Sequence, residues 1–361
     1  MTPTGQALPH PVRRTALHML RHPDRGTTWA GAGVMRFAEP LCDGDTPKVR
    51  ELVEGRLQDL HREFPIVGAR LRGTTWIPGT PNPVVFTDDE TAVDPEAVAA
   101  FDLGTEAPLR LRADSRGRWL TVVPHHAAID GASVMGMFKV LAGHDPSLPS
   151  APRRIGSRTI PPWPVIGRLL HPADPAARSA DLPEGDSFVA VALPPLGKGA
   201  VSRLPEALVG AVAAHNDRLG RPLRRIGLSV SVVESDSETA VASYRRVDLS
   251  AASPIGPAIE AALRSDAEPW EIVHAPRALR LLSPLAPRLS DTLLLSNFGR
   301  IDLPSVASLE IYPVARGRSA LAFGAVRVTG AGSTLTLRAR YLSRSDARGL
   351  LDDALSRLSG S

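Results

Sequence analysis

The stretch TVVPHHAAIDGAS, residues 121–133, leads from an apolar run into two adjacent histidines and then an Asp-Gly pair. If residues 118–125 are extended, neighbouring side chains point to opposite faces, so His125 and His126 cannot easily bind one metal ion. The pair fits a general base on one face and a structural partner on the other, because an ordinary imidazole, with a pKa of about 6.5, accepts a proton at neutral pH. Two histidines held by hydrogen bonds at a strand end are the alternative that the pair by itself leaves open.

The residues after the histidines indicate a tight turn. Gly131 permits a backbone conformation that a residue with a side chain would resist, and Asp130 sits where it can fix that turn by pairing with an arginine. Apolar side chains then recur at helical spacing over residues 132–143. We therefore expect a strand, a turn that begins with the histidines, and a helix.

Outward from this stretch, hydrophobic periodicity and capping signals predict a mixed α/β chain. Thr46 is the expected cap of the first helix, and Pro65 ends that helix where a strand begins. The predicted helices occupy residues 47–62, 202–219, 254–265 and 345–358. The predicted strands are 108–113 and 118–123, which form a hairpin, then 187–193, 225–233 and 244–250, and a second hairpin of 321–330 with 333–342. Residues 291–304 are expected to run from a strand into a loop.

A proline-rich segment without periodicity divides the chain. It predicts an N-terminal lobe of residues 1–145, a crossover linker of residues 146–186 and a C-terminal lobe of residues 187–361. Each half contains strands, a long helix and a hairpin-like pair. We therefore expect two similar α/β lobes with a site between them.

Composition excludes several classes of function. The 361 residues are 43% hydrophobic with a net charge of +4, and no basic run is interleaved with aromatic residues, so we expect no nucleic-acid partner. Cys42 is the only cysteine, which excludes disulfides within the chain, and no cluster with ligand spacing near the histidines predicts a metal. Residues 1–26 lack the apolar core of a signal peptide, and no apolar run approaches the ~18 residues of a membrane span. We expect a cytoplasmic protein, with the alanine-, arginine- and proline-rich composition of a bacterial one.

The segment HHAAIDG, residues 125–131, matches the HHxxxDG signature and resembles one acyltransferase superfamily. That superfamily includes chloramphenicol acetyltransferase, nonribosomal peptide condensation domains, polyketide-associated acyltransferases and wax ester synthases. Three further stretches resemble its elements in the same order: LQDLHREFPIVGARL at 57–71, PLRLRADSRGRWLTVVPHH at 108–126 and LLLSNFGRIDLP at 293–304. The resemblance covers nearly the whole chain.

The resemblance implies a pseudo-dimer of two chloramphenicol-acetyltransferase-like lobes, each a mixed sheet with helices, with an active-site tunnel between them. His126 corresponds to the general base, whereas His125, Asp130 and Gly131 correspond to structural positions. The family also places a loop near the oxyanion of the tetrahedral intermediate. The candidates for that loop are Ser296, Asn297, Gly299 and Arg300, for which ordinary loop hydrogen bonding is the alternative.

The resemblance also defines the partners that we expect. The acyl donor is an acyl-CoA or a phosphopantetheine-linked acyl group, no cofactor is permanently bound, and the acceptor is a small molecule. An acyl or peptidyl carrier protein is a further possible partner. We expect a monomeric enzyme of secondary metabolism.

The chain departs from the family's pattern in two places. The family often keeps an arginine, paired with the motif aspartate, on or just after the strand at 225–233, whereas here the stretch SVSVVESDSE at 229–238 has none; Arg245, Arg246 and Arg300 are the candidates to replace it. The loop reads SNFG where condensation domains have DFGWG, which favours acyl transfer to a small-molecule hydroxyl. Amide formation by a condensation-type enzyme, and a non-catalytic module that binds a carrier protein or an apolar ligand, are the alternatives.

Overall fold

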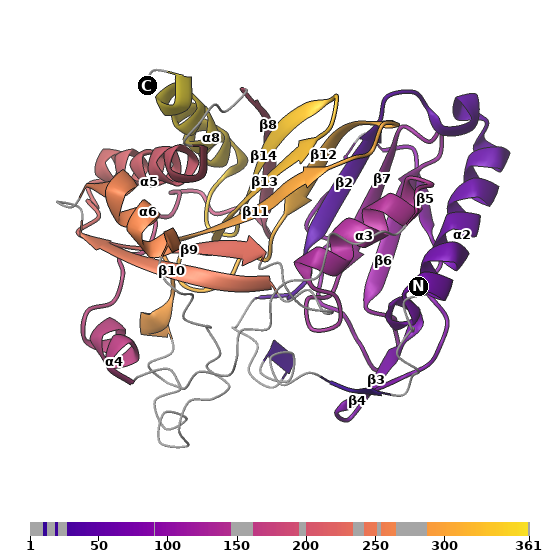
Figure 1. Ribbon diagram of the computed structural model, residues 1–361, viewed down its shortest axis with the longest axis horizontal. Coiled ribbons are helices and arrows are strands. Elements are labelled where there is room, and N and C mark those ends of the chain that lie inside the picture. The colour runs from indigo at the N-terminus through magenta and orange to yellow at the C-terminus, as the bar shows by residue number, and fades with distance from the viewer. Residues whose placement is uncertain are drawn as a thin grey trace. The chain divides into compact units, whose positions relative to one another are not determined.

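The chain divides into two compact units in the computed structural model, which describes residues 10–12, 19–20, 27–89, 91–145, 162–194, 200–233, 242–250, 254–264 and 287–359. Unit 1 comprises Met1–Ala151, Phe298–Val314 and Val326–Gly332, and unit 2 comprises Pro152–Asn297, Ala315–Ala325 and Ser333–Ser361. Each unit contains a mixed β-sheet with helices packed on it, so the predicted α/β class is confirmed (Figure 1). The sequence pattern places all of residues 187–361 in one lobe, whereas the structure assigns two later segments to unit 1.

Unit 1 is built on a five-stranded sheet with the order β12-β2-β7-β6-β5. Its strands are β2 (Ala32–Phe37), β5 (Val85–Thr87), β6 (Leu109–Asp114), β7 (Trp119–Pro124) and β12 (Val306–Tyr312). A smaller sheet consists of β1 (His10–Pro11), β3 (Arg70–Arg72) and β4 (Thr75–Ile77). β7 is the central strand, antiparallel to both β2 and β6, and every residue in it is buried. Burial on both faces explains why the run before the histidines is almost wholly apolar.

A buried carboxylate holds the turn between β6 and β7. Asp114 is fully buried and accepts hydrogen bonds from the main-chain N–H groups of Arg116 at 3.2 Å and Arg118 at 2.9 Å. The Arg118 side chain also donates to this carboxylate, with Nη2 2.7 Å from Oδ1. Gly117 has a φ of 72°, and a Cβ there would lie 2.7 Å from the Leu41 Cβ, so only glycine fits. The predicted hairpin is confirmed, and its turn helps to fix the register of the strand that leads into the histidines.

Two long helices, α2 (Thr46–Glu63) and α3 (Gly131–Leu141), share one hydrophobic core with this sheet (Figure 1). The N-cap of α2 is Asp45, which accepts a hydrogen bond from the Lys48 N–H at 3.2 Å, rather than the predicted Thr46. α3 approaches β2 closely, because a Cβ on Gly33 would lie 2.2 Å from the Phe138 ring. The core side chains that α2 contributes recur at helical spacing: Val49, Val53, Leu57 and Leu60.

Unit 2 is built on a six-stranded sheet with the order β10-β9-β11-β13-β14-β8. Its strands are β8 (Ser187–Leu193), β9 (Arg225–Val233), β10 (Ala242–Ser250), β11 (Leu293–Ile301), β13 (Leu321–Val328) and β14 (Gly332–Ala339). The helices of this unit are α4 (Pro162–Leu170), α5 (Ala200–Arg218), α6 (Ile255–Arg264) and α8 (Arg344–Ser359). α5, α6 and α8 share one apolar core with the sheet (Figure 1). β11 and β13 begin in unit 2 and end in unit 1.

A buried ion pair in unit 2 joins strand β14 to Asp186, the residue just before strand β8. The Arg338 side chain, on β14, is fully buried, and its Nε lies 2.6 Å from Oδ2 of Asp186. The Arg340 Nε lies 3.2 Å from the other oxygen of this carboxylate. Burial lowers the pKa of Arg338, and the Asp186 charge opposes that shift. Because a buried charge is costly unless it is paired, we expect removal of the Asp186 carboxylate to destabilise unit 2.

The predicted elements agree with the structure in most of the described chain. Strands β8 and β9 have the predicted limits, and the helices differ by one or two residues at their ends. The segment after Pro65 differs, because it forms a short 3-10 helix (Pro65–Gly68) before β3 begins. α4 lies inside the predicted linker, of which residues 146–161 are outside the described residues. β2 and β12 pair with each other although they are far apart in the sequence, and neither is among the predicted strands.

Candidate active site

The two motif histidines lie where β7 ends. His125 forms an isolated antiparallel bridge with Ala30, and its N–H donates to the Pro108 carbonyl at 2.8 Å. His126 is the first residue of the turn that follows, and its N–H donates to the Trp29 carbonyl at 2.8 Å. Main-chain hydrogen bonds from both sides therefore fix the positions of the two residues. His125 is buried and His126 is half-buried, and the opposite orientation expected of their side chains stays a prediction.

His125 is packed as a neutral side chain. It is 6% exposed, and its ring makes an edge-to-face contact with Phe101 at a centroid distance of 5.4 Å. Its Nδ1 accepts a hydrogen bond from the Ala127 N–H at 3.2 Å, which requires an unprotonated Nδ1. Burial, followed by the charges of His126 and Arg110, lowers the pKa of His125 to about 4. At neutral pH this ring is therefore uncharged, and its contacts hold the turn in place.

His126 has a side-chain contact that defines its tautomer. Its Nδ1 lies 3.3 Å from the Ile129 carbonyl oxygen, within the same turn. A carbonyl oxygen only accepts hydrogen bonds, so in this pairing Nδ1 carries the proton and Nε2 carries the lone pair. The ring is thereby oriented by its own turn, and Nε2 is the nitrogen that can take up a proton.

Asp130 and Gly131 begin helix α3. Asp130 is the N-cap, and its Oδ1 accepts a hydrogen bond from the Ser133 N–H at 2.9 Å. Gly131 is the first helical residue, which corrects the expectation of a turn that only glycine can adopt. A Cβ at this position would lie 3.4 Å from the Phe298 ring, which is close to ordinary van der Waals contact. Both residues thus set where α3 starts relative to the histidine turn.

The candidate arginines for pairing with Asp130 have other contacts. Arg246 is buried in unit 2, with Nε 2.9 Å from Asp248 and Nη1 3.0 Å from Asp291. The Arg300 Nε donates to the Thr329 hydroxyl at 2.9 Å, and the side chain of Arg245 lies outside the described residues. Arg246 therefore has a local role, in which it joins β10 to the segment before β11.

The SNFGR loop is the second half of β11. Ser296 is buried and pairs with Ser231 of the parallel strand β9, whereas Asn297 is exposed. Gly299 has a φ of 70°, the left-handed conformation that favours glycine. Ser296 and Asn297 belong to unit 2, and Gly299 with Arg300 belongs to unit 1. Their role near an oxyanion stays a prediction.

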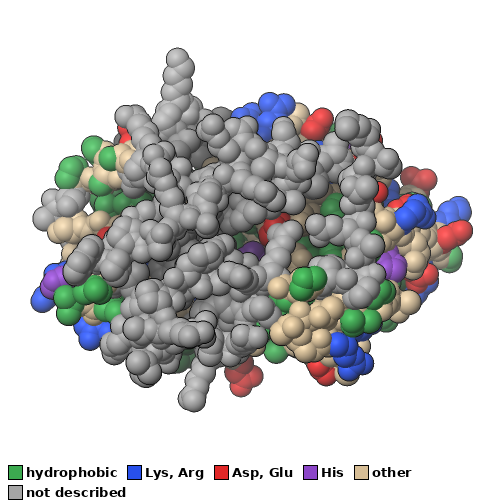
Figure 2. Space-filling view, turned by 60° about the horizontal axis from the view of Figure 1, so that its bottom comes forward, with side chains coloured by type: hydrophobic (Ala, Val, Ile, Leu, Met, Phe, Trp, Pro, Cys, Tyr) green, Lys and Arg blue, Asp and Glu red, His purple; other side chains and the backbone are tan. Residues whose placement is uncertain are grey.

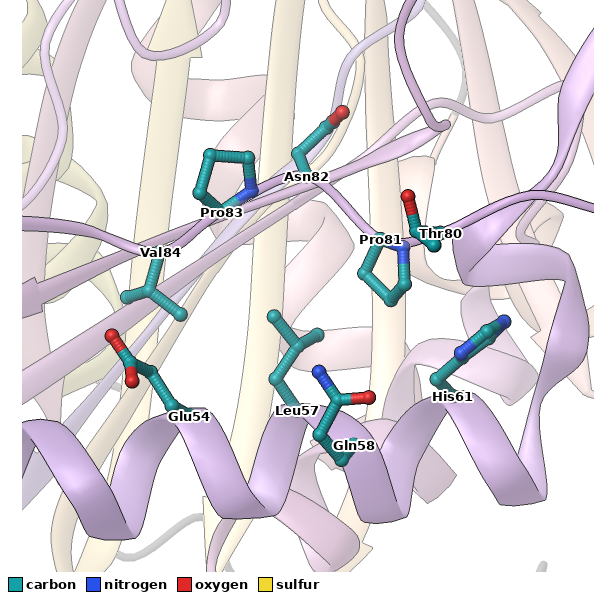
Figure 3. A pocket seen from close by; sticks show the side chains of 9 residues that line it. All are labelled: Glu54, Leu57, Gln58, His61, Thr80, Pro81, Asn82, Pro83 and Val84. Atoms are coloured by element: carbon teal, nitrogen blue, oxygen red, sulfur yellow. The ribbon is translucent and has the colours of Figure 1, made fainter.

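A separate cavity of about 310 Å³ lies in unit 1 between α2 and the extended segment 80–84 (Figure 3). The Asn82 side chain points away from α2, and it holds the segment by donating to the carbonyls of Ala107 at 2.9 Å and Leu109 at 2.8 Å. The motif histidines are not part of this cavity. Its lining residues are Glu54, Leu57, Gln58 and His61 from α2, with Thr80, Pro81, Asn82, Pro83 and Val84 opposite.

Charge on the described surface is mixed. On the face drawn in Figure 2, described Lys and Arg side chains lie among Asp and Glu side chains. Within the described ranges, no three His, Cys, Asp or Glu side chains are grouped as metal ligands. No helix in the part of the chain that the structure describes is long and apolar enough to cross a membrane.

Comparisons with known proteins identify the fold. No protein-family model and no curated protein matches the sequence. Among solved structures, the chain is similar to the first condensation domain of the calcium-dependent antibiotic synthetase in complex with substrate analogue 3a, with a TM-score of 0.61, 14% identity and coverage of 98% of this chain and 96% of that one. It is also similar to the condensation domain from Monacolin K polyketide synthase, with a TM-score of 0.58, 12% identity and coverage of 99% and 98%. A third similar structure is the epimerization domain from the third module of tyrocidine synthetase B, with a TM-score of 0.57, 14% identity and coverage of 99% of this chain and 97% of that one.

These likenesses extend over almost all of both chains, so the chain has the two-lobed fold of condensation and epimerization domains. The resemblance inferred from HHAAIDG and the stretches around it is thereby confirmed at the level of the fold. At 12–14% identity the comparison concerns the fold alone.

Proposed function

We propose that this protein is a condensation-type acyltransferase that joins the acyl group of a pantetheine thioester to an amine, with His126 as general base. The observation that carries the proposal is the pairing of His126 Nδ1 with the Ile129 carbonyl at 3.3 Å, which directs the basic lone pair to Nε2. The likeness to two condensation domains supports amide formation better than the transfer to a hydroxyl that the SNFG loop favours.

The chemistry follows from this tautomer. The acceptor nitrogen attacks the thioester carbonyl carbon, and its proton passes to Nε2 of His126. The tetrahedral intermediate then collapses, so that the carbon–sulfur bond breaks and the new carbon–nitrogen bond remains. The departing thiolate takes the proton from Nε2, which returns His126 to its starting state. The Ile129 carbonyl accepts from Nδ1 throughout and so favours the transient imidazolium.

Other residues support this base without taking up protons. Neutral His125 fixes the turn from the buried side, and Asp130 fixes the start of α3. A role of Ser296 and Asn297 as donors to the oxyanion stays a prediction from the sequence. No permanently bound cofactor is needed, because the donor brings its own activated thioester.

The test is acyl transfer by wild type and His126→Ala. Acyl-CoA, an acyl N-acetylcysteamine thioester and an acyl carrier protein serve as donors, each with matched amine and alcohol acceptors, and thiol release is followed with the product mass. We expect amide formation by wild type and a loss of about 10²- to 10⁴-fold in His126→Ala. His61→Ala is the matched control, since His61 lines the separate cavity on α2 and should leave the rate unchanged.

Two outcomes contradict the proposal. Near-full activity of His126→Ala would remove this residue from the chemistry. If the acyl groups of thioesters at saturating concentration are neither transferred nor hydrolysed above background, the result would support the alternative of a non-catalytic binding module. Ester formation in place of amide formation would restore the hydroxyl acceptor.

A further inference from the structure

Trp29 combines two unfavourable features at one residue. Its φ is 54°, in the left-handed region that few residues other than glycine adopt and that is a genuine outlier for a bulky side chain. Its side chain is buried, with 8% exposure, yet the indole Nε1 has no hydrogen-bond partner among the described residues. A buried donor without an acceptor destabilises a folded chain, and so does this backbone conformation. Such a combination persists where the surrounding structure enforces it, and it is found most often at functional sites.

The strand register places Trp29 beside the candidate base. Ala30 and His125 form a bridge, and the bonds that flank it run from the Gly31 N–H to the Pro124 carbonyl at 3.0 Å and from the His126 N–H to the Trp29 carbonyl at 2.8 Å. This is the pattern of an antiparallel pair, so the residue opposite His126 is Trp29. Opposite residues that share such a bond have Cα atoms about 5.5 Å apart. The backbone of Trp29 therefore lies directly across from that of the candidate base.

A second tryptophan has the same kind of buried indole, so burial without a hydrogen-bond partner does not by itself indicate a functional role. Trp119 is 3% exposed, and its Nε1 also lacks a hydrogen-bond partner in the part of the chain that the structure describes. Trp119 lies at the opposite end of β7, about 20 Å along the strand from the histidines, and its φ is not positive. Trp29 differs from it in both backbone strain and position. Trp119 therefore serves as the matched control.

We infer that the Trp29 indole N–H is held to donate a hydrogen bond to a carbonyl oxygen of the acyl donor that docks beside His126. This inference rests on the proposed function, because that function supplies the substrate. A pantetheine thioester offers two kinds of carbonyl oxygen, the thioester oxygen at the reacting carbon and the amide oxygens of the pantetheine arm. In the first case the bond strengthens as negative charge develops on the oxygen, and in the second it contributes to binding alone.

The experiment compares Trp29→Phe with Trp119→Phe. Because phenylalanine also changes the volume, a third protein carries 3-benzothienylalanine at position 29, which keeps the indole shape and replaces N–H with sulfur. kcat and KM are measured for the acyl donor, and the Kd is measured for a donor analogue in which CH₂ replaces the thioester sulfur. Melting temperature reports on the fold of each variant.

We expect both position-29 variants to lose about 5- to 10-fold in kcat/KM through KM and Kd if the partner is an amide oxygen, and about 100-fold through kcat if it is the thioester oxygen. Trp119→Phe should stay within about twofold of wild type, and the benzothienyl protein should melt at the wild-type temperature. Values within about twofold for both position-29 variants, while His126→Ala is inactive, would overturn the inference and leave the proposed function standing. If wild type is inactive but Trp29→Phe weakens binding of the analogue, the inference stands and the proposed function fails. If wild type binds no thioester or analogue, both fail.

Discussion

His125 makes the stability of this protein depend on pH. Its pKa lies near 6.5 in an unfolded chain, and burial with the nearby positive charges lowers it to about 4 in the folded one. At a pH between these two pKa values, His125 binds a proton in the unfolded chain but not in the folded one. The contribution of neutral His125 to folding stability is therefore fully present above about pH 6.5, and it decreases as the pH falls toward 4.

The magnitude follows from the two pKa values. At pH 5 protonation favours the unfolded chain about 30-fold, which corresponds to a loss of about 2 kcal/mol relative to pH 7.5. Carboxylates contribute little over this interval, because their ordinary pKa values lie at about 4. The loss should therefore come chiefly from histidines.

The assay is urea unfolding of wild type and His125→Asn at pH 7.5 and pH 5. Asparagine keeps an acceptor for the Ala127 N–H but does not titrate, so the variant should lack about 2 kcal/mol of the pH-dependent loss that wild type shows. Ring-labelled histidine followed by NMR gives the pKa of His125 directly. Equal losses in the two proteins, or a measured pKa of about 6.5, would refute the conclusion that His125 is buried as a neutral ring.

Four other substitutions test burial, packing and helix stability in the two units. Asp186→Asn should cost about 3–5 kcal/mol in urea unfolding, because it removes the carboxylate charge that lies 2.6 Å from the buried Arg338, whereas Asp352→Asn in an exposed pair on α8 should cost less than about 1 kcal/mol. Equal losses of unfolding free energy in the two variants would show that the buried ion pair contributes no more to stability than the exposed one. Gly227→Ala should destabilise by about 1–3 kcal/mol, because its Cβ would lie 2.9 Å from a neighbouring alanine Cβ. Gly55→Ala, in the exposed middle of α2 with no atom within 4 Å, should instead raise the melting temperature, and a lower value would contradict the helix assignment.

The elements nearest to the motif follow largely from local pattern. The run before the histidines is apolar because β7 is buried on both faces, and strand alternation predicts opposite faces for the side chains of His125, which is buried, and His126, which is half-buried. α2 is predictable from the spacing of its apolar side chains, although its cap is one residue earlier than expected. These features depend on residues close together in sequence, which is why the sequence alone is enough.

The tertiary structure decides the partners of these residues. β2 escapes prediction because its partners, β7 and β12, lie far along the chain, and the same pairing brings Trp29 opposite His126. Nothing in the local sequence distinguishes Trp29, since its left-handed φ and its indole without a hydrogen-bond partner among the described residues exist only in the folded chain. Asp130 is similar, because the sequence indicates that a carboxylate matters there, and only the start of α3 shows that it caps a helix. The sequence by itself determined most of the helices and strands, though not β2, β12 or α4, and it indicated which histidine is the candidate base. Packing between segments distant in sequence determined what surrounds that base, because hydrogen-bond partners and burial are properties of the folded chain.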